Sequence, residues 1–260
     1  MATTHRRNDR RRRSWSPNAR RRAPEGEDWL WGWHAVRAAL ANPARGEPRR
    51  LLASADRARL LGPAGRIAEI LPAAEIGQLL PKGAAHQGVA LLAGPIEPMA
   101  LADLASPAAG VLVMLDQVTD PQNVGAIFRS AAAFGARGVI LQERHAPSLA
   151  GALAKAAAGA IERAPHAREV NLARALERLA DLGWRAIGLD ARGADRLDHC
   201  LDGRPTVLVM GSEGEGLRRL VGEHCDVLAR IPMAGDFESL NVAAAAAVAL
   251  SMASRVGGQG

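Results

Sequence analysis

The chain has 260 residues, a formal net charge of +6 and a hydrophobic fraction of 48%, enough apolar material for one large domain or two small ones. Its two cysteines, Cys200 and Cys225, have no CxxC partner and no metal-ligand spacing, which argues against a disulfide framework and a structural zinc. The longest apolar run, residues 242–250, is about half as long as a membrane span, so we expect a soluble protein. The two cysteines suit a reducing cytosol, so we expect a cytoplasmic protein, and no metal is expected.

The excess of positive charge lies at the N-terminus. Residues 1–27 hold nine arginines against three acidic residues, whereas the rest of the chain balances 24 basic residues against 24 acidic ones. So polar and basic a segment is expected to be a disordered arm. Binding to RNA phosphates, a plain solvated tail and an organelle-targeting peptide remain three alternatives for it, although it lacks the apolar stripe of an import helix.

Residues 28–94 have the pattern of a small α/β unit. Hydrophobic periodicity predicts, in chain order, a helix over 34–41, a strand over 50–53, helical turns over 55–70 that are interrupted at Gly62-Pro63, and a strand over 88–93. Three prolines in the stretch that follows indicate a linker, which we place at residues 95–109.

Trp29, Trp31 and Trp33 alternate near the start of this unit, in a chain with no tyrosine and three phenylalanines. Such rings can stack on unpaired bases. The plainer interpretation is packing in the core or at a domain junction, and we adopt it. His86 is likewise interpreted as a turn residue without a catalytic role, because it stands beside Gln87 and a glycine.

A first motif occupies residues 115–135 (LDQVTDPQNVGAIFRSAAAFG). The apolar run 111–115 that leads into it fits a strand buried on both faces. The polar turn after this strand predicts Asn123 as the N-cap of a helix over 125–134. On spacing alone, Asn123 is that cap and Arg129 is an exposed charge on the helix.

A second motif occupies residues 207–220 (VLVMGSEGEGLRRL), and its apolar start predicts a strand over 207–210. Three glycines are spaced G-x-x-G-x-G, beginning at Gly211, which matches neither a dinucleotide-binding loop nor a P-loop. Glu213 and Glu215 would put two carboxylates where a pyrophosphate should sit. The loop therefore suits a ligand that is not an anion, and glycine backbone lets such a ligand approach closely.

A third motif occupies residues 231–243 (IPMAGDFESLNVA). It predicts a strand end over 231–233, a loop over 234–238 and then an alanine-rich helix. Ser239 or Asn241 is expected to cap that helix whatever its function.

The order and wording of the three motifs closely resemble the SpoU (TrmH) class of RNA ribose 2′-O-methyltransferases, in the SPOUT superfamily. Residues 32–36 (GWHAV) and 85–89 (AHQGV) are also similar to the N-terminal RNA-binding domain of the RlmB-type bacterial enzymes, which modify a guanosine in large-subunit (23S) ribosomal RNA. The resemblance covers nearly all of residues 29–254.

This resemblance implies an α/β fold in two domains. Residues 110–256 would form a SPOUT catalytic domain with a parallel sheet and a deep trefoil knot, and residues 28–94 a small α/β domain that grips the substrate RNA. The family also functions as homodimers with the active site close to the interface. True knots are rare, and hydrophobic periodicity does not predict one.

The resemblance further implies S-adenosylmethionine as the cofactor, whose sulfonium and ammonium charges suit the acidic second motif. The expected cofactor-binding residues are Gly211, Ile231 and Leu240. The expected catalytic residues are Asn123, Arg129, Glu213, Ser239 and Asn241.

The expected chemistry is attack by a ribose 2′-hydroxyl on the methyl group, and that hydroxyl must lose or share its proton. Family mechanisms assign this activation to the arginine, here Arg129. Because a guanidinium is an awkward base, our hypothesis is that Arg129 fixes the RNA phosphate and stabilises developing alkoxide charge. Asn123, Ser239 and Asn241 would orient the ribose and Arg129, while Glu213 holds the site together.

The expected function is methylation of a guanosine ribose in 23S ribosomal RNA. A tRNA ribose methyltransferase is the closest alternative, although such enzymes usually lack the N-terminal domain. A non-catalytic assembly factor that binds ribosomal RNA is a second alternative, against which the complete set of polar site residues argues.

Overall fold

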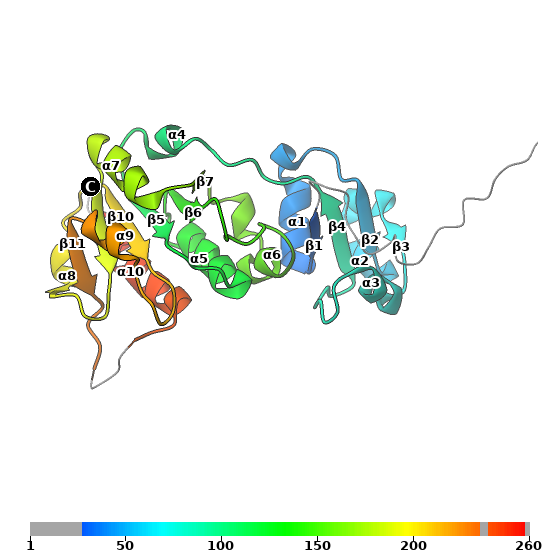
Figure 1. Cartoon of the computed structure of the whole chain (residues 1–260). Helices are drawn as coiled ribbons and strands as arrows, with labels where there is room; N and C mark the ends of the chain where they lie inside the picture. Colours follow the sequence, from blue (N-terminus) through cyan, green and yellow to red (C-terminus); the bar gives the residue numbers. More distant parts are fainter. Residues whose placement is uncertain (1–27, 235–238, 258–260) are drawn as a thin grey trace, which may run out of the picture.

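The computed structural model describes residues 28–234 and 239–257, so the arginine-rich segment 1–27 and the loop residues 235–238 lie outside the described part. Two sheets organise the chain, one of four strands and one of seven. Figure 1 shows them as two neighbouring bodies, the first coloured blue to cyan and the second green to red. In the described part, no helix is long and apolar enough to cross a bilayer.

The four-stranded sheet has the order β1-β4-β2-β3, in which β4 runs antiparallel to both its neighbours and β2 pairs with β3 in parallel. Its elements are β1 (Asp28–Trp31), α1 (Trp33–Ala41), η2 (Pro43–Arg45), β2 (Arg50–Ala53), α2 (Ala55–Leu60), η3 (Gly62–Ile67), β3 (Glu69–Ile70), α3 (Ala73–Leu79) and β4 (Val89–Ala93). The predicted helix and two strands are confirmed to within a residue.

The predicted helical turns over 55–70 are wrong at their end. Glu69 and Ile70 pair with Leu52 and Ala53 as strand β3. The helix α2 stops at Leu60 because the following Gly-Pro pair supplies a residue at positive φ and removes a backbone donor.

The seven-stranded sheet has the order β7-β6-β5-β10-β8-β11-β9, and all its strand pairs are parallel. Its strands are β5 (Val111–Leu115), β6 (Gly138–Gln142), β7 (His166–Glu169), β8 (Arg185–Leu189), β9 (Asp195–Arg196), β10 (Thr206–Met210) and β11 (Val227–Arg230). The predicted α/β class with a parallel sheet is confirmed. The trefoil knot stays a prediction.

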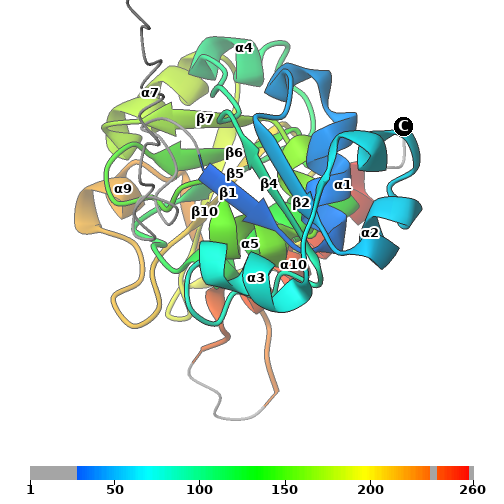
Figure 2. The same ribbon diagram turned by 90° about the vertical axis from the view of Figure 1, so that its right-hand side faces the viewer.

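Helices cover both faces of this sheet, which lies behind the four-stranded sheet in the view of Figure 2. Along β5 the side chains alternate: Val113 and Leu115 pack on the face of α5, α6 and α10, and Leu112 and Met114 pack on the face of α4, α7 and α9. The helices are α4 (Leu101–Ala105), α5 (Pro121–Ala133), α6 (Gly151–Ala157), η4 (Ala160–Glu162), α7 (Leu172–Asp181), α8 (Leu197–Cys200), α9 (Arg219–Glu223) and α10 (Val242–Gly257). Because both faces are covered, β5 and β10 consist of continuous apolar runs, as predicted.

The predicted linker contains the short helix α4, whose Leu101 and Leu104 are buried against the seven-stranded sheet. The third motif also departs from its predicted outline. Strand β11 ends at Arg230, so residues 231–233 lie beyond it; Pro232 has no N–H with which to continue the ladder.

The first motif departs from its prediction in a way that matters for the site. Helix α5 begins at Pro121, and the N-cap is Asp120, whose carboxylate accepts hydrogen bonds from the backbone N–H groups of Gln122 and Asn123 at 3.3 and 3.2 Å. Proline suits the first helical position because its missing N–H would have no partner there. Asn123 is therefore not the cap, and its side chain is available for other contacts.

The tryptophans and His86 follow the plainer interpretation. Trp29 and Trp31 are buried, and a Cβ placed on Gly151 would lie 2.9 Å from the ring of Trp31, so this ring packs at the contact between β1 and α6. Trp33 is half-buried. His86 Nδ1 accepts a hydrogen bond from the N–H of Gly88 at 3.2 Å, which closes the turn before β4.

A buried ion pair links the two bodies. Arg45, at the end of η2, contacts Glu162 of η4 at 2.8 Å, and the side chains are only 4% and 3% exposed. Asn42 Nδ2 donates to the same carboxylate at 2.7 Å, and Arg45 also donates to the carbonyl of Gly94. All the strong polar groups at this contact are thus paired, as burial requires.

Candidate active site

The three sequence motifs meet at one edge of the seven-stranded sheet. Strands β5, β10 and β11 are parallel members of this sheet, so their carboxyl ends open onto the same edge. The chain first builds β5, β6 and β7 outward, then crosses to β8, and β10 fills the position between β5 and β8. Ligands of open α/β sheets bind at such a reversal of strand order.

One carboxylate oxygen joins the three motifs. Glu213 Oε1 accepts hydrogen bonds from Asn123 Nδ2 at 3.1 Å, from Asn241 Nδ2 at 2.5 Å and from the backbone N–H of Val242 at 3.3 Å. Asn241 Nδ2 also donates to Asn123 Oδ1 at 2.9 Å. We call Asn123, Glu213 and Asn241 the amide–carboxylate cluster. It brings together three of the five predicted catalytic residues.

Asn241 serves the cluster and its own helix at once. Its Oδ1 accepts hydrogen bonds from the backbone N–H groups of Ala243 and Ala244 at 3.0 and 3.2 Å, which caps α10 as predicted. The cap fixes the side chain, so its Nδ2 points toward Glu213. The start of α10 is thereby tied to the loop after β10.

That loop, residues 211–217, is folded back on itself, and we call it the acidic loop. Ser212 and Gly216 exchange two backbone hydrogen bonds, at 3.1 and 3.0 Å. A Cβ on Gly211 would lie 2.2 Å from the carbonyl carbon of Gly216, so no other residue fits there without moving the loop. Gly216 also requires glycine, at φ +71°. The motif's glycines thus make a compact turn that presents Glu213.

A second anchor of the acidic loop is an ion pair that the sequence analysis did not assign to the site. Asp116, fully buried at the end of β5, accepts hydrogen bonds from the backbone N–H and from Nε of Arg218 at 2.8 and 2.7 Å, and its carboxylate lies 2.6 Å from Nη2. The available signal was an aspartate directly after a buried strand. A buried carboxylate needs a partner, but the sequence alone does not indicate which arginine supplies it.

Arg129 and Ser239 are not part of the cluster. Arg129 is exposed on α5, six residues beyond Asn123, which corresponds to roughly 9 Å of helical rise. Neither side chain forms a hydrogen bond or ion pair with any described residue. Arg129 is thus an exposed cation without a partner among the described residues.

The predicted cofactor-binding residues lie at the same sheet edge. Gly211 follows β10, Ile231 follows β11, and Leu240 precedes α10. Ile231 is half-buried against the core, whereas Leu240 is 39% exposed. The segment between the last two includes residues 235–238, which are outside the described part.

The charges around the acidic loop do not suit an anion. Glu213 is neighboured by neutral amides, and the guanidinium of Arg218 is already held by Asp116. Burial, together with smaller effects of the carboxylates of Asp226 and Asp116, raises the pKa of Cys225 to about 12. This thiol stays protonated and is not a nucleophile.

Comparison with known proteins identifies the class to which this fold and site belong. Residues 110–251 match the model of the SpoU rRNA methylase family. The chain therefore belongs to the SpoU rRNA methylase family.

Curated relatives are similar to about two thirds of the chain. A relative from Mycobacterium avium (strain 104), described as an uncharacterized tRNA/rRNA methyltransferase, is 48% identical over 174 residues, which are 65% of this chain and 56% of the relative. The chain thus spans little more than half the length of the curated relatives it matches.

Two solved structures resemble the whole fold. The SpoU methyltransferase AviRb from Streptomyces viridochromogenes, in complex with AdoMet, has a TM-score of 0.76 and 25% identity, and the match covers 94% of this chain and 97% of that one. An AdoMet-bound rRNA methyltransferase from Sinorhizobium meliloti has a TM-score of 0.73 and 25% identity, with 88% and 87% covered.

Proposed function

We propose that this chain is an S-adenosylmethionine-dependent RNA methyltransferase that methylates the 2′-hydroxyl of a guanosine ribose in large-subunit (23S) ribosomal RNA, as RlmB-type enzymes do. The observation that carries the proposal is the amide–carboxylate cluster, in which side chains from all three motifs meet at the sheet edge where ligands bind. Membership of the SpoU family and the AdoMet-bound neighbours support the cofactor. The neighbour from Sinorhizobium meliloti supports ribosomal RNA as the substrate class.

The residues of the acidic loop fit this cofactor. Its exposed carboxylates and its lack of an unpaired cation among the described residues favour a ligand with positive charge, such as a sulfonium and an ammonium group. Backbone groups at Gly211, Ile231 and Leu240 would hold the adenosine part. When bound, the cofactor supplies an activated methyl group.

The remaining residues act on the RNA. Asn123 and Asn241, held by Glu213, orient the ribose, and Ser239 assists them from the third position before α10. Arg129, exposed and free of protein partners in the described part, binds the RNA phosphate and stabilises negative charge as the 2′-oxygen gives up its proton. Such fixed groups lower the barrier because they need no reorganisation during the reaction.

The rest of the chain would serve RNA binding and assembly. The body built on the four-stranded sheet, residues 28–94, binds the substrate RNA, and residues 110–256 form the catalytic domain. The protein functions in the cytoplasm as a homodimer. The match to AviRb, which covers 94% of this chain, supports the view that both bodies belong to one enzyme.

The test is methyl transfer from labelled S-adenosylmethionine to unmodified total RNA, followed by separation of ribosomal and transfer RNA and identification of the labelled nucleoside. Label in large-subunit RNA as 2′-O-methylguanosine is the expected result. Label in tRNA would replace the proposed substrate with its alternative. Cofactor binding without transfer to any RNA would favour the non-catalytic assembly factor.

Two glutamates of the acidic loop provide a matched pair of variants. Glu213 accepts three hydrogen bonds at the cluster, whereas Glu215 is exposed and accepts none from the described residues. Glu213→Gln replaces a charged acceptor with a neutral one and is expected to lower the rate of methyl transfer about tenfold or more. Glu215→Gln removes the same charge two residues away, and at saturating S-adenosylmethionine it is expected to leave the rate of methyl transfer unchanged.

A further inference from the structure

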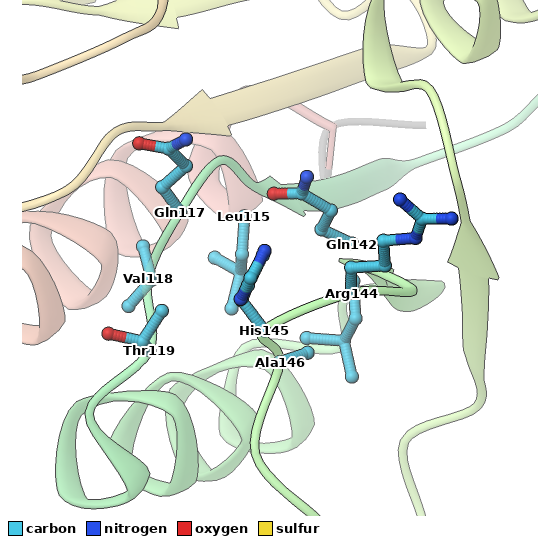
Figure 3. Close-up of a pocket in the computed structure, with 9 residues that line it drawn as sticks. Leu115, Gln117, Val118, Thr119, Gln142, Arg144, His145 and Ala146 are labelled. Atoms are coloured by element: carbon cyan, nitrogen blue, oxygen red, sulfur yellow. The ribbon is translucent and has the colours of Figure 1, made fainter.

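A small pocket lies between the carboxyl ends of β5 and β6 (Figure 3). Its floor is formed by the buried side chains of Leu115, Val118 and Leu141. The β5 side of the pocket continues into Asp120, the cap of α5, and so into the first turn that carries Asn123. The loop that lines the pocket therefore leads directly into the helix turn that carries Asn123.

Gln142, one of the residues that line the pocket, has a side-chain acceptor without a hydrogen-bond partner among the described residues. Gln142 Oε1 is shielded from solvent and accepts no hydrogen bond within the described residues. Buried polar atoms are almost always paired, and one that is not costs free energy which a bound N–H donor would recover. On the rim, the side chains of Arg144 and His145 are exposed and free of hydrogen bonds to the described part of the chain.

Two residues at the mouth have an unfavourable backbone conformation. Gln117 has φ +57° and His145 has φ +71°, in the left-handed region that non-glycine residues seldom adopt. Figure 3 shows them on the two loops that face each other across the pocket. Such conformations persist where the surrounding structure enforces them, and they cluster at ligand-binding sites.

We propose that this pocket binds the base of the nucleotide whose ribose is methylated, and that Gln142 is its specificity-determining residue. This inference rests on the proposed function. An amide that both donates and accepts matches the hydrogen-bonding edge of a base, and the apolar floor accommodates the ring atoms of that edge. The cavity is partly open and small, about 10 Å³, so the edge of the base enters while the rings lie at the mouth. Only an unpaired nucleotide can present its base in this way, and Arg144 is placed to contact the neighbouring phosphate.

The test compares Gln142→Met with Leu182→Met in the full chain. Methionine has nearly the shape of glutamine but no amide. Leu182, at the end of α7, is 39% exposed, so its replacement introduces the same residue elsewhere without a change of charge. With labelled S-adenosylmethionine and unmodified ribosomal and transfer RNA, Gln142→Met is expected to lower kcat/KM for the RNA about tenfold or more, while its affinity for the cofactor stays unchanged. A merely structural Gln142 predicts the opposite pattern, a higher unfolding temperature with unchanged kcat/KM, and that result would overturn the proposal.

A second measurement separates this inference from the proposed function. If the wild-type chain methylates none of these RNAs, the proposed function fails, but the pocket can still be tested with the four ribonucleoside 5′-monophosphates. Backbone amide NMR signals of residues 115–119 and 141–146 are expected to shift in the wild type and in Leu182→Met, and not in Gln142→Met. Absence of such shifts in the wild type at millimolar nucleotide would overturn the proposal.

Discussion

The ion pair between Asp116 and Arg218 offers a direct way to test how the acidic loop is held. Asp116→Asn keeps the shape of the side chain and removes its charge. Arg218 N and Nε donate to this carboxylate at 2.8 and 2.7 Å, and Nη2 lies 2.6 Å from it. The asparagine offers one acceptor oxygen in place of two. Its NH₂ group faces the Arg218 guanidinium, and both groups are hydrogen-bond donors, so no bond forms between them.

The expected cost follows from this geometry. Hydrogen bonds to a charged group are worth about 1.5–3 kcal/mol each, and breaking a buried ion pair costs about 3–5 kcal/mol. Arg218 is 39% exposed, so water can replace part of what it loses. We therefore expect Asp116→Asn to lower the free energy of unfolding by about 3 kcal/mol, which for a chain of this size lowers Tm by roughly 6–12 °C.

The assay is thermal unfolding with and without S-adenosylmethionine, together with calorimetric measurement of cofactor affinity. The pair anchors the loop that carries Glu213. Each 1.4 kcal/mol or so by which the variant destabilises the binding conformation of this loop therefore weakens the affinity for S-adenosylmethionine about tenfold. The matched control is Asp198→Asn, since Asp198 pairs with Arg196 at 2.7 Å but both side chains are well exposed, and such pairs contribute at most about 1 kcal/mol. If Asp116→Asn behaves like this control, the anchoring role is refuted.

Three further outcomes are expected. Glu162→Ala leaves the guanidinium of Arg45 buried without its partner and should lower the free energy of unfolding by about 3–5 kcal/mol in urea denaturation. Arg45→Met combined with Glu162→Ala should recover much of this loss, and an unchanged midpoint for the single variant would contradict the assignment. Arg129→Lys keeps the charge but loses the planar fork, so methyl transfer should fall about tenfold with cofactor affinity unchanged; near-normal turnover would exclude a role for the fork. Burial, with smaller effects of nearby arginines, lowers the pKa of His166 from 6.5 to about 4. The unfolded chain binds this proton more strongly than the folded one. The contribution of neutral His166 to the free energy of unfolding is therefore fully present above pH 6.5, and roughly 3 kcal/mol of it is lost as the pH drops towards 4. His166→Leu should flatten that decline in urea midpoints, and an equal slope in both proteins would refute the assignment.

Much of the local structure could be predicted from the sequence. The strands β5 and β10 and the helix α1 match their predicted positions because continuous apolar runs and glycine or proline boundaries reflect short-range sterics and burial. The convergence of the three motifs was also predictable, since loops at the carboxyl ends of parallel strands share one sheet edge. The insertion of β10 between β5 and β8 was not, because strand order depends on long-range packing.

The chemical details of the site depend on contacts that span the chain. Asp120 and Asn123 can both cap a helix, and local pattern does not decide between them. Asp120 takes the cap, while Asn123 bonds Glu213, 90 residues further along the sequence.

The sequence by itself determined the α/β class, the main strands and helices, and the residue types available at the three motifs. Only the tertiary structure decided which polar groups pair: Asp116 with Arg218, and Arg45 with Glu162, across separations of 102 and 117 residues. The physical reason is that secondary structure follows from forces between near neighbours in the chain. The partner of a buried charge is instead whichever group the completed fold brings within hydrogen-bonding distance.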